Sequence, residues 1–530
     1  MKFTTEKRLE EAVARSLSAR CRIADENLRW LRDKMHPYFW ITMQDEPEAV
    51  AALALRLREL GRELLLLLAD RERRLIVARP NRPGSLYETL RRLSEREISY
   101  AQFTQSYGPM PGLEEGLEIQ RFEFDRKSHR EIREAGDPAI PRAIRRGVRT
   151  AVRKAYPRFA PGELDRLLDL LWLNNESYVR ISPPRRVAQL LWLFHQGNQQ
   201  GGIHLDVEET EDTEHRRGYR VMFAAANPPQ VDFLQQIMEV FNRLGIGVKR
   251  AYCLTLSNGV HPYFLGTFYV HSRSEALLDR NSELFIRLRK ELYNTQILSS
   301  SSLPYREFVV NRVMSGEEAS LVNAFIAFCH TNLAHAQPDR FGFDDVQGAF
   351  QAHPDLALKL VWLFTTRFDP TLEERGKLYE QALAEAEREI TGYNTGHRYL
   401  DEVRRTVLRC SLLFIRHTLK TNFFVPEKQA LAFRLDPVYL DELGAGFTAD
   451  LPPERPFRVT FFFGRHGAGY HIGFSDIARG GWRTVLAKGW DDYLTAANTV
   501  FRENYVLAHT QHLKNKDIYE GGSKMVVVLD

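Results

Sequence analysis

The spacing of hydrophobic and polar positions divides the N-terminal half of the chain into helical and extended segments. Hydrophobic side chains recur at helical spacing between residues 49 and 60, which predicts an amphipathic helix. From residue 74 the pattern predicts a β-α-β-β unit. Its elements are a strand at 75–78, a turn at 81–84, a helix at 85–94 and extended runs at 98–103 and 117–124.

The same order of elements recurs between residues 219 and 271. It consists of a strand at 219–224, a turn at 227–229, a helix at 231–244 and strands at 248–256 and 263–270, with Asn258-Gly259 in the last hairpin. We interpret the two units as a degenerate internal repeat and predict that they form separate small sheets with helices on one face. Two alternatives stay open: generic α+β packing without a ligand, and pairing of the two units into one shared sheet.

The C-terminal half is predicted to begin after a serine run at residues 299–302, which we interpret as a linker with a domain boundary near residue 310. The segments expected beyond it are helices at 316–334, 354–364, 372–388, 397–420 and 436–443 and extended runs at 422–433, 457–464, 470–477 and 526–529. We therefore expect a multidomain α+β protein. Its parts are residues 1–140 with the first unit, a helical connector at 141–215, the second unit at 216–310, and 311–530.

Charge and cysteine usage exclude several classes of protein. The 530 residues include 73 Lys and Arg against 69 Asp and Glu, so the net charge of +4 creates no strong field for nucleic acid or an anionic membrane. The cysteines show no metal or disulfide spacing: Cys21, Cys253, Cys329 and Cys410. The N-terminus has no apolar signal segment, and the leucine run at 64–68 is too short to span a bilayer. We expect a soluble, cytoplasmic protein.

One basic stripe is predicted on a helix between the two units. It consists of Arg142, Arg145, Arg146, Arg149 and Arg153. A nucleic-acid surface would interleave aromatic side chains with such a stripe, and only Tyr156 and Phe159 lie nearby. We therefore favour a solvated or interdomain face over a nucleic-acid contact.

A long helix is predicted from residue 490 to 513. Its core-facing positions are Leu494, Ala497, Phe501, Asn504, Ala508 and Gln511, and Lys514 continues the same face. His509 and His512 have the spacing of two metal ligands, but no third ligand follows, so a helix surface is favoured. The glycine-rich run at 464–469 joins two apolar strands, which favours a hairpin turn over a dinucleotide site.

Two double-glycine stretches near the end of the chain carry the candidate chemistry. Gly480-Gly481 lies between Arg479 and Arg483, and Gly521-Gly522 precedes Lys524. Glycine pairs reach positive φ and let a backbone approach a ligand closely. We predict two turns beside fixed cations, which suit a pocket for a dianionic substrate.

These stretches resemble the substrate domain of NAD-dependent glutamate dehydrogenases, and most closely the long-subunit branch of that family. The resemblance covers residues 405–530 and includes the segments 419–424 and 430–437. It implies that residues 311–530 hold a helical segment and an incomplete α/β substrate domain of the amino-acid dehydrogenase type. The two β-α-β-β units resemble ACT-type ligand-sensing modules.

The resemblance also implies roles for individual residues. Lys524 matches the catalytic lysine that polarises the carbonyl of 2-oxoglutarate. The residues that match substrate-binding positions are Arg479, Gly480, Gly481, Gln511, Lys514, Gly521 and Gly522. Arg479 would bind the side-chain carboxylate and the pair Gln511 and Lys514 the α-carboxylate, whereas Arg483 is assigned a structural role. Met525 and Tyr519 stand where the family usually has glycine and proline, and Met525 is expected to crowd the pocket floor.

The predicted function is oxidative deamination of L-glutamate to 2-oxoglutarate and ammonium. No cofactor-binding or metal-binding residues are expected in this chain, since NAD would be bound by a domain downstream of Asp530. The chain is therefore expected to be the N-terminal portion of a homo-oligomeric dehydrogenase, inactive alone, with an amino-acid effector and without a nucleic-acid or membrane partner. The alternative is a non-catalytic protein that senses amino acids through the ACT-like modules.

Overall fold

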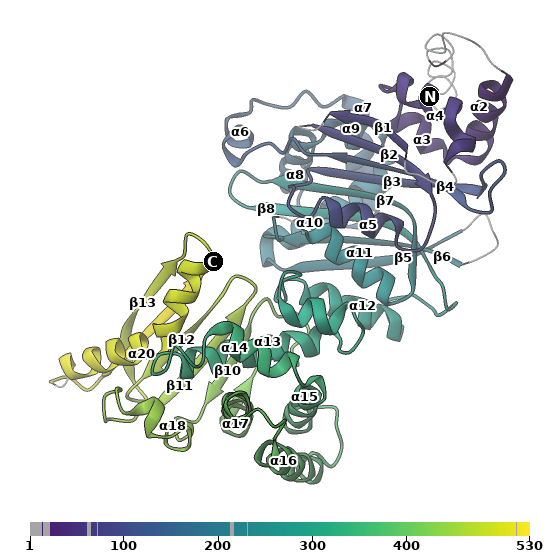
Figure 1. Ribbon diagram of the computed structural model, residues 1–530. Helices are drawn as coiled ribbons and strands as arrows, with labels where there is room; N and C mark the ends of the chain where they lie inside the picture. Colours follow the sequence, from purple (N-terminus) through teal and green to yellow (C-terminus); the bar gives the residue numbers. More distant parts are fainter. Residues whose placement is uncertain are drawn as a thin grey trace. The chain divides into compact units, whose positions relative to one another are not determined.

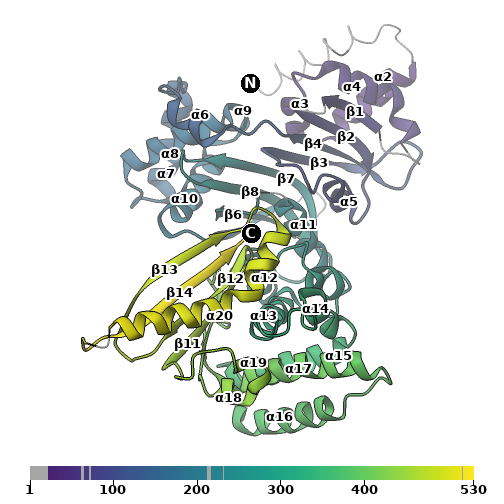
Figure 2. The same cartoon turned by 60° about the vertical axis from the view of Figure 1, so that its left-hand side comes forward.

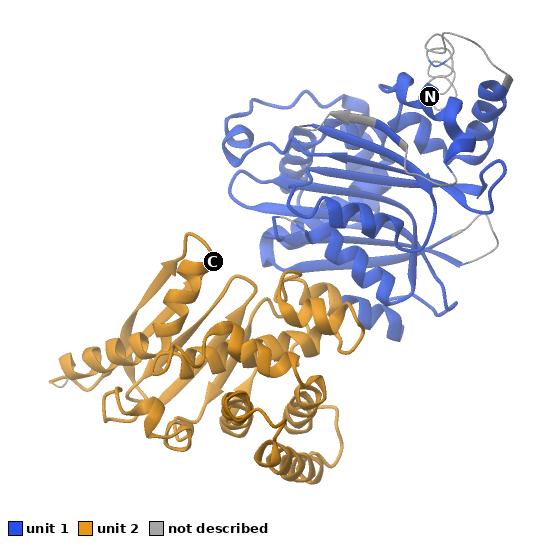
Figure 3. Ribbon diagram, viewed as in Figure 1, with its two compact units in different colours: residues 1–289 blue, residues 290–530 orange. Residues whose placement is uncertain are grey.

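The computed structural model describes residues 13, 22–60, 65–70, 73–211, 217–230, 232–515 and 517–530 (Figure 1). The chain divides into two compact units, Met1–Arg289 and Lys290–Asp530 (Figure 3). The serine run at 299–302 and residue 310 both lie within the second unit. Within the described residues, no helix has the length and apolar character needed to cross a bilayer.

The first unit is built on one eight-stranded antiparallel sheet. Its strands in chain order are β1 (Leu65–Asp70), β2 (Arg74–Pro80), β3 (Tyr100–Pro109), β4 (Gly116–Glu123), β5 (Ile203–Glu211), β6 (Arg217–Ala226), β7 (Ile246–Ser257) and β8 (Pro262–Ser272). Their order in the sheet is β1-β2-β4-β3-β7-β8-β6-β5. The second half of this order repeats the first in reverse, so the two halves are related by a pseudo-twofold axis.

The two predicted β-α-β-β units are therefore present, but they do not form separate sheets. Strand β3 of the first unit pairs with β7 of the second, with Gln102 opposite Tyr252 near the middle of the ladder. The prediction of separate small sheets is wrong, and the alternative of a shared sheet is confirmed. An unpaired edge strand leaves a row of unsatisfied backbone groups, and joining β3 to β7 removes one such edge from each half. Each unit also gains a preceding strand, β1 or β5, that the sequence pattern did not reveal.

Two helices lie side by side on one face of this sheet (Figure 1). They are α5 (Ser85–Arg92) and α11 (Phe233–Arg243), one from each repeat. Aromatic contacts hold α11 on the sheet: the ring of Phe241 meets Phe268 edge to face at 5.0 Å, and Phe233 meets Phe264 at 5.1 Å. Residue 231, where the helix was predicted to begin, lies outside the described residues.

The opposite face of the sheet is covered by two helical groups. They are α2 (Arg22–Lys34), α3 (Pro37–Thr42), α4 (Pro47–Arg56) and η1 (Leu57–Glu59), and then α6 (His129–Glu134), α7 (Arg142–Ala155), α8 (Pro161–Asn174), α9 (Glu176–Ile181) and α10 (Pro184–Gln200). The first group packs on β2 and β4 and includes the predicted helix at 49–60; helices of the second group pack on β6 to β8.

The predicted basic stripe lies on α7 and is partly neutralised. Arg145 and Arg149 both form ion pairs with Asp165 of α8, at 3.4 and 2.6 Å, and Arg145 also pairs with Asp169 at 2.7 Å. Two of the five arginines thus connect neighbouring helices. The prediction was a solvated or interdomain face, and the ion pairs join two helices of the same unit.

The second unit combines a helical layer with a six-stranded sheet. Its helices are α12 (Glu283–Asn294), which spans the division between the units, η2 (Pro304–Val309), α13 (Gly316–Leu333), α14 (Phe343–Gln351), α15 (Pro354–Phe368), α16 (Arg375–Gly392), α17 (Arg398–His417), α18 (Tyr439–Leu443), α19 (Ala445–Thr448) and α20 (Trp490–Lys514). Its strands are β9 (Thr418–Thr421), β10 (Leu431–Leu435), β11 (Arg458–Gly464), β12 (Gly467–Gly473), β13 (Ala478–Leu486) and β14 (Gly521–Leu529). They are ordered β13-β14-β12-β11-β10-β9.

Only β13 and β14 are parallel in this sheet, and α20 connects them in a β-α-β crossover. Figure 2 shows α20 running along these strands. The sequence pattern predicted the helix but neither the strand at 478–486 nor the crossover. The turn at 464–469 is confirmed as the β11–β12 hairpin, in which Gly464 pairs with Gly467.

The predicted core face of α20 is largely confirmed. Ala497, Phe501, Asn504 and Ala508 are buried, and the Phe501 ring meets that of Tyr470 at 5.1 Å. Lys514, at the end of the same stripe, is exposed. Cysteines 253, 329 and 410 are buried free thiols, whereas Cys21 lies outside the described residues.

Candidate functional site

The candidate site is built by the crossover β13–α20–β14. In the parallel ladder Arg479 lies opposite Gly522, and Gly481 lies opposite Lys524. Arg483 forms an ion pair with Glu503 of α20, so the odd-numbered positions of β13 face this helix. Arg479, Gly481 and Lys524 therefore share the helix-covered face of the sheet.

The glycines serve a different purpose from the one predicted. Neither doublet forms a turn: Gly480 and Gly481 lie within β13, and Gly521 and Gly522 begin β14. None of the four is among the positive-φ glycines of the described residues. They permit close packing instead, because a Cβ on Gly480 would lie 1.5 Å from the Ser523 carbonyl oxygen and one on Gly522 would lie 1.9 Å from His512 N.

Gly481 provides the space that Lys524 occupies. A Cβ at position 481 would lie 3.3 Å from Lys524 Nζ, so the amine lies directly over this glycine. Lys524 itself is half-buried. Met525 follows Lys524 in the strand and points to the opposite face of the sheet. The expectation that Met525 crowds the pocket floor is therefore wrong.

Arg479 is exposed and forms an ion pair with the carboxylate of Glu520. Its Nε donates a hydrogen bond to Glu520 Oε2 at 2.5 Å. This bond raises the pKa of the Arg479 guanidinium and lowers the pKa of the Glu520 carboxyl. The geometry shows that Arg479 can bind a carboxylate at this position. The sequence analysis did not identify Glu520 as a site residue, although its position directly before Gly521-Gly522 could have indicated one.

Gln511 is linked to the beginning of β14 through the side chain of Asn515. Its Nε2 donates to Asn515 Oδ1 at 3.0 Å, and Asn515 Nδ2 donates to the Gly521 carbonyl at 3.1 Å. Lys514 is exposed in the last turn of α20, and within the described residues its side chain forms no ion pair. The structure thus brings Arg479, Gly481 and Lys524 together on adjacent strands and places Gln511 and Lys514 at the adjoining helix end.

The two histidines of α20 have a partner that sequence spacing did not show. His509 Nε2 and His512 Nε2 each lie 3.3 Å from a carboxylate oxygen of Glu454, which precedes β11. Among the described residues no group of three or more His, Cys, Asp or Glu side chains is arranged to hold a metal ion.

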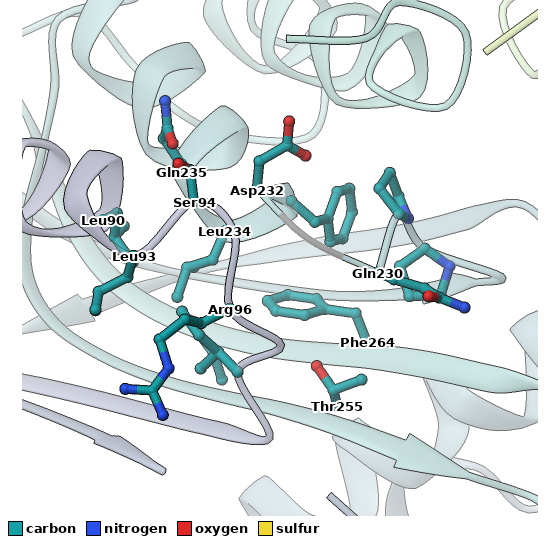
Figure 4. Close-up of a pocket in the computed structure, with 15 residues that line it drawn as sticks. Leu90, Leu93, Ser94, Arg96, Gln230, Asp232, Leu234, Gln235, Thr255 and Phe264 are labelled. Carbon is teal, nitrogen blue, oxygen red and sulfur yellow. The ribbon is translucent and has the colours of Figure 1, made fainter. Parts of the chain in front are cut away.

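The first unit contains two pockets that the pseudo-twofold axis relates. Each lies between the strand-to-helix turn of one repeat and the C-terminal end of the other repeat's helix. The smaller one, of about 30 Å³, lies between the turn at 228–230 and the end of α5. It is lined both by apolar side chains such as Leu90, Leu234 and Phe264 and by polar ones such as Arg96 (Figure 4). Neither pocket was predicted as a specific site.

The second pocket is the larger of the two and also has charged residues in its lining. Its volume is about 210 Å³, and it lies between the turn at 81–84 and the end of α11. Glu118 lines it and is buried, and its carboxylate accepts hydrogen bonds from Ser85 Oγ at 2.9 and 2.8 Å. Burial raises the pKa of Glu118. Arg82 and Arg273 supply positive charge to the same pocket.

Comparison with known proteins gives a partial match. No family model matches the chain. Over 124 residues it is 44% identical to an NAD-specific glutamate dehydrogenase of Saccharomyces cerevisiae, which covers 23% of this chain and 11% of the yeast protein. The match to an NAD-specific glutamate dehydrogenase of Neurospora crassa is 42% over 130 residues, or 24% of this chain and 12% of the relative.

A longer and weaker match covers more of the chain. It is 24% identical over 307 residues to an NAD-specific glutamate dehydrogenase of Halomonas elongata, which covers 55% of this chain and 17% of that protein. The predicted resemblance to NAD-dependent glutamate dehydrogenases is therefore confirmed as a sequence similarity. The chain spans only 11–17% of the length of these relatives.

Proposed function

We propose that the second unit supplies part of the substrate site of an NAD-dependent glutamate dehydrogenase, which converts L-glutamate to 2-oxoglutarate and ammonium. The parallel register of β13 and β14 supports this proposal most directly. It sets Arg479 and Lys524 on one face, on adjacent strands and two residues apart along the ladder. A guanidinium and an amine at this spacing suit a substrate with two carboxylates and a carbonyl between them.

Each side chain has a role that follows from its chemistry. Arg479 binds the side-chain carboxylate of glutamate, in exchange for Glu520. Gln511 and Lys514 bind the α-carboxylate at the end of α20. The amine of Lys524 polarises the carbonyl of 2-oxoglutarate and exchanges protons with the reacting centre.

The chain's own β-α-β unit does not suit NAD. A dinucleotide site of this kind needs a glycine-rich turn and a helix N-terminus that accepts the pyrophosphate. The connection from β13 to α20 has a single glycine, Gly489, and the first turn of α20 carries Asp491 and Asp492, which repel an anion. We therefore infer that NAD is bound outside the residues of this chain, and that the chain alone forms no NADH from glutamate.

Titration of the chain with 2-oxoglutarate by isothermal calorimetry tests the substrate site. A charge-assisted hydrogen bond contributes about 1.5–3 kcal/mol, so Arg479→Ala is expected to weaken binding by roughly ten- to a hundredfold. Lys488→Ala is the matched control, because this exposed lysine lies in the connection between β13 and α20. Absence of saturable binding, or equal binding by the Arg479 variant, would contradict the proposal.

The role of Lys524 is tested in the natural polypeptide that carries this sequence. Lys524→Ala is expected to lower kcat far more than it weakens substrate binding, because the amine acts on charge that develops during the reaction. A variant with unchanged kcat and a raised KM would show that Lys524 only binds substrate.

A second candidate function is amino-acid sensing by the first unit. The pocket of about 210 Å³ has room for about seven water molecules, which corresponds to a small amino acid. Glu118 and Gln105 offer acceptors for an ammonium group, and Arg82 and Arg273 offer donors for a carboxylate.

Ligand-induced thermal stabilisation separates the two functions. A screen of the twenty amino acids should find one that stabilises the chain and still does so when Lys524 is replaced by Ala. Replacing Arg82 and Arg273 together by Ala should abolish this stabilisation while binding of 2-oxoglutarate is retained. If no amino acid stabilises the chain, the sensing function is excluded.

A further inference from the structure

The last turn of α20 and the first residues of β14 are in direct backbone contact. A Cβ on Gly522 would lie 1.9 Å from His512 N, 2.3 Å from His512 Cα and 2.4 Å from Gln511 C. Such distances leave no space for any side chain at position 522. The position of the strand that carries Lys524 is therefore set by the helix turn that carries Gln511.

The His512 ring also bonds to this strand. Its Nδ1 accepts a hydrogen bond from the Gly522 amide at 3.2 Å. An imidazole nitrogen that accepts a hydrogen bond carries no proton, so the proton of the neutral ring is on Nε2. Nε2 lies 3.3 Å from Glu454 Oε1, within reach of that proton. The two contacts together select one tautomer of His512.

Phe474 completes the surroundings of this bond. Its ring stacks on the His512 ring with centroids 5.6 Å apart and an interplanar angle of 27°, and its amide donates to the Gly522 carbonyl at 3.0 Å. Both backbone groups of Gly522 are thus bonded, one to the helix side chain and one to the segment between β12 and β13. Lys524 follows only two residues later.

We propose that His512 is a positioning residue of the substrate site, whose imidazole Nδ1 holds Lys524 in register with the helix end bearing Gln511 and Lys514. This proposal rests on the proposed function, which assigns the reacting carbonyl to Lys524 and the α-carboxylate to the helix end. In this proposal His512 contacts neither the reacting carbonyl nor the α-carboxylate of the substrate. Its Nδ1 fixes the separation between the two parts of the site, and Glu454 fixes the tautomer that makes Nδ1 an acceptor.

Two substitutions distinguish this role from simple packing. Asparagine at position 512 places Oδ1 near the position of Nδ1, so His512→Asn keeps an acceptor for Gly522 but loses the ring. His512→Phe keeps a ring against Phe474 and loses the acceptor. A positioning role predicts that Asn preserves function and Phe does not, whereas a packing role predicts the opposite order. His509→Phe is the matched control, because His509 lies beside Glu454 and Phe474 without bonding to Gly522.

Hydrogen exchange of the Gly522 amide in the isolated chain measures the bond directly. Faster exchange in His512→Phe, with near-native exchange in His512→Asn and His509→Phe, is expected. Equal protection of the amide in the Phe and native proteins overturns the proposal. This measurement needs no enzymatic activity, so it decides the structural claim even if the chain proves to bind no 2-oxoglutarate.

Steady-state kinetics of the natural polypeptide measure the consequence. Misplacement of a reacting group by about 1 Å can cost a hundredfold in rate, so His512→Phe is expected to lower kcat by roughly ten- to a hundredfold while KM changes less. His512→Asn should restore most of kcat. If both variants lose kcat equally while the native protein is active, the positioning role is wrong and the proposed function stands. If the native protein neither binds 2-oxoglutarate nor turns over glutamate, the proposed function itself fails, and with it the positioning role.

Discussion

Adding one methyl group at Gly522 should separate the two parts of the candidate site, which are the strand that carries Lys524 and the helix end that carries Gln511 and Lys514. Ordinary van der Waals contact begins near 3.4 Å, and the new Cβ would lie 1.9 Å from His512 N, so helix and strand must move apart by about 1.5 Å, the difference between these distances. The atoms it meets belong to the backbone of α20, which cannot rotate away as a side chain can. Overpacking of this kind costs about 1–3 kcal/mol.

This cost is measurable by thermal unfolding of the chain. One kcal/mol changes the Tm of a unit of this size by about 2–4 °C, so Gly522→Ala should lower the Tm of the second unit by roughly 2 to 12 °C. The same movement displaces Lys524 from the end of α20, and binding of 2-oxoglutarate should weaken with it.

Gly348→Ala provides the matched control within the second unit. This glycine lies inside α14, where a Cβ would meet no atom within 4 Å. Alanine there should stabilise the protein by about 0.5–1 kcal/mol, because it reduces the freedom of the unfolded chain. Unchanged stability of Gly522→Ala, together with the expected gain at Gly348, would refute the close packing described for β14 and α20.

Two further predictions concern titration and competition in the second unit. Burial lowers the pKa of His330 to about 4, below the ordinary value of 6.5. The unfolded chain therefore takes up a proton at this residue more readily than the folded chain, so the free energy of unfolding is unaffected above pH 6.5 and decreases as the pH falls toward 4. His330→Gln, which keeps a donor to Asn498, should therefore remove about 3 kcal/mol of the stability change between those pH values in urea titrations, and an unaltered pH dependence would contradict this. Glu520→Gln removes the charge that occupies Arg479 and should tighten binding of 2-oxoglutarate by roughly two- to fivefold in calorimetry; weaker binding would show that Glu520 supports the site.

Local sequence patterns were sufficient for many elements of this protein. Period-two and period-3.6 spacing predicted both β-α-β-β units, the β11–β12 hairpin and the buried face of α20, because each depends on residues close in the chain. The same patterns missed β1 and β5, whose leucine-rich and acidic sequences do not alternate clearly. They also predicted one extended run at 422–433, whereas β9 ends at Thr421 and β10 begins only at Leu431.

The residues of the candidate site were likewise recognisable, but their arrangement was not. Arg479, Lys524 and the two glycine pairs stand out in the sequence through their composition. Their adjacency depends on the parallel pairing of β13 with β14, two strands separated by the whole of α20. The glycines were misinterpreted as turns, because φ and close packing cannot be distinguished from residue type alone.

The sequence by itself therefore determined many of the helices and strands, and it showed which residues carry the candidate chemistry. Only the tertiary structure decided that the two repeats join through β3 and β7, that Glu520 occupies Arg479, and that His512 bonds to Gly522 while facing Glu454. These contacts join positions that are distant in the chain or whose side chains meet only when a helix packs on a sheet. Pairing of this kind is selected by burial and by satisfaction of backbone and polar groups across the whole fold, which no local window of sequence contains.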